Sequence, residues 1–168
     1  MIKEITRQTG LFFLLLFIQL LILNHIEFSG YINGYIYVLF ILTLPLNTPK
    51  WMLLFAGFAI GFSVDLFFQT LGIHTLASLC MAYIRPFLLN VISPREGYEN
   101  GMRPDVNLFG FSWFIKYAFI LVLAHHLVLF YTEVFVFHQF FHTMLRVIAS
   151  TLFTMLLLIL SQMLILKR

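Results

Sequence analysis

Charged side chains are scarce in this sequence of 168 residues. The seven Asp and Glu and the ten Lys and Arg make up 10% of the chain, whereas charged residues make up about 25% of a typical soluble domain. A single cysteine, Cys80, excludes a disulfide within the chain. The longest polar stretch, residues 93–112, is too short to fold as a domain outside a membrane.

Hydrophobic residues, by contrast, are in large excess. They make up 61% of the chain, and 21 of them are Phe. A water-soluble core of this size could not bury so much apolar surface. The composition therefore excludes a soluble enzyme, a nucleic-acid-binding domain and a disordered chain, and it indicates an integral membrane protein in contact with the lipid bilayer.

Six apolar runs are interpreted as membrane-spanning helices, which typically need about 20 residues each. The runs lack the alternation of apolar and polar residues that marks the strands of a membrane β-barrel. We therefore expect a single all-α membrane domain over residues 1–168 with six transmembrane helices. The predicted spans cover residues 8–26, 31–46, 51–68, 73–92, 114–130 and 141–166.

Basic residues are distributed unequally between the two sides of this arrangement. Six spans place both termini on one side, and eight Lys and Arg lie on that side, whereas the connections on the opposite side contain Glu27 and Glu133 and no Lys or Arg. Cytoplasmic connections carry the excess of positive charge, so both termini are expected in the cytoplasm. The eight residues are Lys3, Arg7, Lys50, Arg95, Arg103, Lys116, Lys167 and Arg168.

The third run carries an acidic residue on a face of small residues. Gly57, Gly61 and Asp65 follow one another at intervals of four, so they share one face of a helix. Small residues let a neighbouring helix approach closely, and the same face would turn Asp65 away from lipid. A carboxylate in a span needs a partner or a proton. A structural ion pair or hydrogen-bond anchor is favoured over a proton-carrying role.

Two basic residues could be the partner of Asp65. Arg146 lies at a similar predicted depth, near the outer end of the sixth span. Arg85 lies in the inner half of the fourth span, where its side chain could reach the cytoplasmic headgroups. Pro86, which follows it, predicts a kink or an early end of that helix. Depth therefore favours a pair between Asp65 and Arg146.

Histidines gather near the outer end of the last two spans. His138 and His142 are four residues apart, which on a helix is a spacing used by ligands of transition metals. No third ligand follows at a fixed spacing, so interfacial aromatic side chains are the favoured interpretation, and His74 is interpreted in the same way. The sequence also lacks the motifs of a catalytic triad, an intramembrane aspartate pair or a phosphate-binding loop. We expect neither an enzyme nor a bound cofactor.

The run from Gly57 to Leu66, followed by Gly72 and the apolar residues 75–83, resembles the MreD family of rod shape-determining membrane proteins. The similarity covers roughly residues 10–90. It implies a non-enzymatic subunit of the bacterial inner membrane that belongs to the cell-elongation machinery. It also implies binding to an MreC-like protein with a single span, and through it to an MreB-like filament and to peptidoglycan synthases.

A second interpretation remains open. The MreD family is similar in fold to the six-helix substrate-binding subunits of energy-coupling-factor transporters, so the chain could bind a small, vitamin-like molecule. Such a subunit should show polar side chains that converge on a pocket. A scaffold instead needs an apolar groove for a partner helix. The residues proposed as structural or partner-binding are Gly57, Gly61, Asp65, Gly72, Arg85, Pro86 and Arg146.

Overall fold

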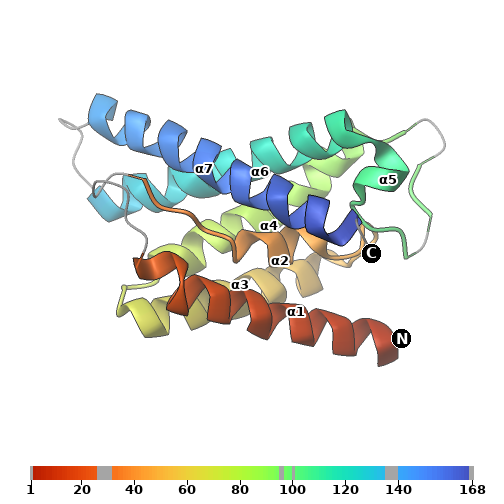
Figure 1. Ribbon diagram of the computed structural model, residues 1–168, viewed down its shortest axis with the longest axis horizontal. Coiled ribbons are helices and arrows are strands. Elements are labelled where there is room, and N and C mark those ends of the chain that lie inside the picture. Colours follow the sequence, from red (N-terminus) through yellow and green to blue (C-terminus); the bar gives the residue numbers. More distant parts are fainter. Residues whose placement is uncertain (1, 26–31, 95–96, 100, 135–139, 167–168) are drawn as a thin grey trace.

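The computed structural model describes residues 2–25, 32–94, 97–99, 101–134 and 140–166, and in these parts it contains seven α-helices and one short 3-10 helix (Figure 1). All the long elements are helices, in agreement with the predicted fold class. The elements are α1 (Ile2–Leu21), η1 (Leu23–His25), α2 (Val38–Thr43), α3 (Lys50–Phe68), α4 (Ile73–Val91), α5 (Val106–Phe109), α6 (Phe111–Val134) and α7 (Phe140–Leu166).

The long helices run side by side along the longest axis of the molecule (Figure 1). α4 packs between α3 and α6, α7 packs on α6, and α1 packs on α3. The start of α1, α5 and the end of α7 lie at one end of the bundle, here called the terminal end. η1 and the turn from α3 to α4 lie at the opposite end, here called the cavity end.

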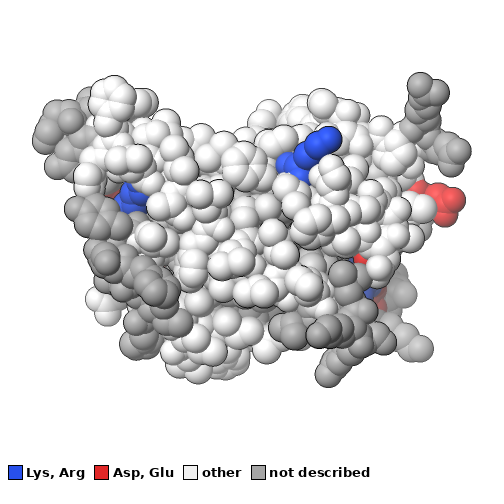
Figure 2. Space-filling view, turned by 45° about the horizontal axis from the view of Figure 1, so that its top comes forward, with Lys and Arg blue, Asp and Glu red and all other residues white. Residues whose placement is uncertain are grey.

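Four helices are long and apolar enough to cross a membrane: α1, α3, α6 and α7. Their outward side chains are large and apolar, as on α7, where Leu145, Ile148, Leu152, Leu156 and Leu160 form an exposed stripe. The face shown in Figure 2 carries few charged residues. A surface of this kind is stable against lipid and not against water, so the structure is that of a membrane protein.

α4 differs from these four helices in its polar content. It has 19 residues, but it contains His74 and Arg85, and both side chains are buried in the bundle. The helix continues through Pro86 to Val91, so the early end predicted at this proline is wrong. α4 packs against α3 on one side and α6 on the other, and this packing offsets the loss of the hydrogen bond that a proline cannot donate.

The predicted helix over residues 31–46 is also wrong. Of the described residues 32–46, six are helical, in α2, and residues 32–37 form no helix. Even so, the segment runs from the cavity end, which Asn33 lines, to the terminal end, where Leu46 N donates to Met102 O at 2.8 Å. The chain therefore passes between the two ends here without a complete helix.

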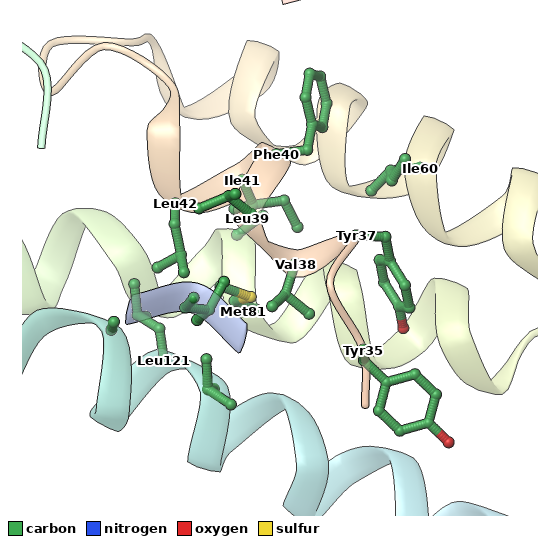
Figure 3. Packing of buried hydrophobic residues seen from close by; sticks show 14 of the residues in the cluster. Tyr35, Tyr37, Val38, Leu39, Phe40, Ile41, Leu42, Ile60, Met81 and Leu121 are labelled. Carbon is green, nitrogen blue, oxygen red and sulfur yellow. The ribbon is translucent and has the colours of Figure 1, made fainter. Parts of the chain in front are cut away.

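This second passage fills the centre of the bundle. Every residue from Gly34 to Leu44 is buried. Figure 3 shows its side chains among those of α3, α4 and α6, including Ile60, Met81 and Leu121. Non-helical backbone is tolerated at membrane depth only where protein or a water-filled cavity surrounds it. The apolar run reflects burial in protein rather than a helix in contact with lipid.

Candidate functional site: a polar cavity at one end of the bundle

Asp65 joins the end of α3 to the start of α4. Its Oδ1 accepts the backbone N–H of His74 at 3.1 Å, and its Oδ2 accepts the backbone N–H of Thr75 at 2.8 Å. The hydroxyls of Thr70 and Thr75 also donate to the carboxylate, and His74 Nδ1 lies 3.0 Å from Oδ1. The first N–H groups of a helix lack partners within the helix and favour negative charge. Asp65 thus caps α4 from the preceding helix.

The turn between the two helices makes this contact possible. Gln69 ends α3 in the left-handed conformation with φ of 55°, and Gly72 precedes α4 with φ of 87°. Glycine adopts such angles without strain, so Gly72 allows the chain to turn sharply before α4. The chain reverses within a few residues and brings the start of α4 back to Asp65.

The glycine face of α3 lies directly on α4. A Cβ added at Gly57 would lie 2.9 Å from Ser78 O, and one added at Gly61 would lie 2.6 Å from Thr75 Cα. Real Cβ atoms do not approach other atoms so closely. The two glycines therefore let the backbones of α3 and α4 touch, which holds Asp65 against the start of α4.

The non-helical residues 33–36 are held by side chains from distant helices. Gln19 of α1 donates from Nε2 to Gly34 O at 3.1 Å and accepts from Ile36 N at 2.9 Å. On α7, Ser150 Oγ accepts from Asn33 N at 3.1 Å and Thr154 Oγ1 accepts from Tyr35 N at 3.2 Å. These bonds replace the ones that a helix would provide.

The non-helical segment and its neighbours enclose a cavity of about 220 Å³ at the cavity end. α1, η1, the residues before α2, and α3, α4, α6 and α7 all contribute to its wall, as does the turn from α3 to α4. The polar residues of the wall are Gln19, Asn24, Asn33, Thr70, His74, Glu133 and Arg146. The convergence of polar side chains from so many elements makes this cavity the candidate ligand site.

Arg146 lies in this cavity, but it does not pair with Asp65. Its Nη1 lies 3.1 Å from Glu133 Oε2, and its guanidinium carbon lies 4.4 Å from the centre of the Phe130 ring. The predicted pair of Asp65 and Arg146 is therefore wrong. Both residues do lie at the same end, but the hairpin supplies Asp65 with five hydrogen-bonding groups from Thr70, His74 and Thr75.

Arg85 forms a second polar centre, near the terminal end. Its Nε donates to Tyr117 Oη at 2.6 Å, and its Nη2 donates to Leu44 O. Tyr117 donates in turn to Leu42 O at 3.0 Å. The carbonyls at the end of α2 carry partial negative charge, which a guanidinium stabilises. Arg85 is completely buried, so its predicted extension to the headgroups is wrong.

Buried histidines extend the polar interior toward α6. Tyr37 Oη lies 2.8 Å from His125 Nε2, and His126 lies between Val122 O and Thr154 Oγ1. His142 lies on an exposed part of α7, and His138 is outside the described residues. Within the described ranges, no three His, Cys, Asp or Glu residues gather as a metal site.

Several of these residues were not predicted as site residues. The roles of Asn33, Ser150 and Thr154 depend on the non-helical segment, and that of His74 depends on the turn that returns the start of α4 to Asp65. One signal was present: small polar residues recur on α7 at Thr143, Ser150 and Thr154, spaced by seven and four, and all three are buried. A polar stripe of this period predicts a helix face turned toward polar groups of the protein.

Comparisons with models of protein families, with curated proteins and with solved structures give no match. The class of the molecule therefore rests on its own geometry. It is a helical membrane protein with a polar cavity at one end of the bundle.

Proposed function

We propose that this chain is a non-enzymatic, six-span subunit of the bacterial inner membrane, with both termini in the cytoplasm, that serves the cell-elongation machinery as the MreD family does. In this role it binds the membrane helix of an MreC-like protein. That partner connects it to an MreB-like filament and to peptidoglycan synthases. The resemblance of residues 10–90 to the family supplies the identity of the partner.

One structural observation supports this proposal: an apolar groove of about 700 Å³ between α1 and α3. Phe12 and Phe13 of α1 form one wall, and Met52 and Phe55 of α3 form the other. Phe40 of α2 also lines the groove, as do the small residues Ala56 and Ala59 of α3.

Small side chains allow the backbone of a second helix to approach, which is how helices associate in lipid. The terminal end of the groove is polar, because Glu4, Gln8 and Asn47 line it. Glu4 also pairs with Arg103. A partner helix that occupies the groove would leave the membrane at this polar edge, on the side proposed to be cytoplasmic.

Photo-crosslinking in native membranes tests the groove. A photoreactive side chain at Phe13 or Phe55 should crosslink to a protein with a single span, because both residues line the groove. The same group at Leu152, exposed on α7, serves as the control and should crosslink only to lipid. Equal crosslinking at all three positions would contradict a specific partner in the groove.

A filled groove provides an independent test. Ala59→Phe places an aromatic ring where a partner helix would pack, and it should abolish co-purification of that partner. Leu152→Phe changes α7 by a similar volume and should leave co-purification intact. If Ala59→Phe retains the partner, the interface lies elsewhere.

The polar cavity favours a second candidate function, the small-molecule-binding subunit of a transporter. Its polar wall has the convergence that such a subunit requires. Co-purification distinguishes the two candidates. A single-span protein in the complex supports the scaffold, whereas an energy-coupling module with ATPase subunits supports the transporter.

A further inference from the structure

Among the described residues, one acidic and one basic side chain line the polar cavity. Glu133 and Arg146 are its only lining residues among Asp, Glu, Lys and Arg within the described parts of the chain. Asp65 does not line the cavity, and its carboxylate accepts hydrogen bonds from Thr70, His74 and Thr75. The cavity therefore offers one cation and one anion to a ligand, beside the neutral polar groups of its wall.

The guanidinium of Arg146 is held by two neighbours, but one of its hydrogen-bond donors has no acceptor among the described residues. Phe130 lies against it at 4.4 Å, and Glu133 Oε2 engages Nη1 at 3.1 Å. Its Nε is buried and has no hydrogen-bond partner among the described residues. Buried donors almost always have an acceptor, and a guanidinium binds carboxylate or phosphate through two parallel donors. Nε is therefore a donor to which the described residues offer no acceptor.

We propose that this cavity binds a small zwitterion. The anionic group of the ligand, a carboxylate or a phosphate, accepts from Arg146, and its ammonium group lies against Glu133. A volume of about 220 Å³ is below the roughly 300–1,000 Å³ typical of sites for drug-sized molecules. The ligand is therefore the size of an amino acid or of an ethanolamine phosphate headgroup.

The charge of the pair selects a zwitterion over a simple anion. An anion at Arg146 would lie beside the Glu133 carboxylate and be repelled by it, whereas a zwitterion satisfies both side chains. The pair itself is a weak structural element, since the Glu133 side chain is 38% exposed and exposed pairs contribute about 0–1 kcal/mol. The inference does not rest on the groove between α1 and α3, and either can fail alone.

The ligand could be dissolved or could be the headgroup of a lipid, and two arms of one experiment distinguish these sources. The full chain, purified in detergent without phosphatidylethanolamine, is titrated with glycine and with phosphoethanolamine, and binding is followed by calorimetry. The chain is also placed in nanodiscs of phosphatidylethanolamine or of phosphatidylglycerol, and retained lipid is measured by native mass spectrometry. Binding in the first arm identifies a dissolved zwitterion, and selective retention in the second arm alone identifies a headgroup.

Variants of the pair connect either result to the cavity. Arg146→Gln should weaken binding at least tenfold, and Arg146→Lys should restore part of it. Glu133→Gln should keep the fold and lose the preference for phosphoethanolamine over inorganic phosphate. Lys116→Gln, at the start of α6 near the terminal end, is the matched control and should bind as the unmodified chain does. Absence of zwitterion binding in both arms, or unchanged binding by Glu133→Gln and Arg146→Gln, would overturn the proposal.

Discussion

Asp65 Oδ2 accepts the backbone N–H of Thr75 at 2.8 Å, across the turn that joins α3 to α4. The carboxylate is thus the cap of the helix that follows it rather than the partner of a distant arginine. This contact depends on the close approach of the two backbones at Gly61. The acid and the glycine face therefore serve one structural purpose, the fixed hairpin beside the polar cavity.

Asp65→Ala should lower the free energy of unfolding by about 3 kcal/mol. The substitution leaves the buried N–H of His74, the partly buried N–H of Thr75 and the Thr70 and Thr75 hydroxyls without their acceptor. Each such loss costs up to about 1–3 kcal/mol before relaxation. Thermal unfolding in detergent measures the change. In the double variant with Arg146→Ala, the two effects should add to within about 0.5 kcal/mol, because the residues do not pair. A larger coupling energy between the two substitutions would be evidence that Asp65 and Arg146 do form an ion pair.

Gly61→Ala should separate α3 from α4 and unfold the hairpin. The new methyl group would lie 2.6 Å from Thr75 Cα and 2.7 Å from His74 O, both of them backbone atoms that cannot rotate away. Gly10→Ala is the matched control, because a Cβ at Gly10 meets nothing within 4 Å. Proteolysis and thermal unfolding compare the two variants. Equal stability would contradict the close approach of α3 and α4 at Gly61.

Thr154→Val should weaken the support of the non-helical segment. The side chains are similar in shape, but valine cannot accept from Tyr35 N or contact His126 Nε2. An unpaired buried N–H costs about 1–3 kcal/mol. Thr132→Val is the control, since the Thr132 hydroxyl donates only within α6, to Val128 O and Leu129 O. Hydrogen exchange at residues 34–36 should rise in the first variant only.

Arg85→Met should destabilise the protein by about 3 kcal/mol, because it removes the donors to Leu44 O and Tyr117 Oη inside the bundle. A double-mutant cycle with Tyr117→Phe should show a coupling of about 1 kcal/mol or more, since the two side chains are in contact. Arg103→Met removes a partly exposed ion pair with Glu4 and should cost less than about 1 kcal/mol. If Arg85→Met lowered the stability no more than Arg103→Met does, the hydrogen bonds of Arg85 would not stabilise the bundle.

Cysteine labelling tests the orientation in the membrane. In a background with Cys80→Ser, Leu71→Cys, a fully exposed position in the turn at the cavity end, should react with an impermeant reagent added outside the cell. Leu108→Cys, exposed on α5 at the terminal end, should react only after the membrane is opened. The reverse pattern would place the termini outside the cytoplasm and overturn the proposed orientation.

The sequence predicted the parts of this fold that depend on local composition. The apolar runs of α1, α3, α6 and α7 form helices long and apolar enough to cross a membrane, and large apolar side chains dominate their outward faces. The spacing of Gly57 and Gly61 predicted a face of close approach, and α4 occupies it. The need of Asp65 for partners was also evident. The identity of these partners was not evident from the sequence. The short turn after α3 brings His74 and Thr75 back to the Asp65 carboxylate, and they bind it in place of a residue from α7.

What the sequence by itself determined is a helical membrane protein with a small-residue face on α3, since hydropathy and spacing are properties of each segment alone. Tertiary structure decided the rest. Residues 31–46 form a mostly apolar run, yet Gln19, Ser150 and Thr154 hold residues 33–36 outside a helix, because side chains far away in the sequence satisfy their backbone. The non-helical residues 33–35 form part of the wall of the polar cavity, and there Glu133 of α6 and Arg146 of α7 form a charge pair that neither helix provides alone.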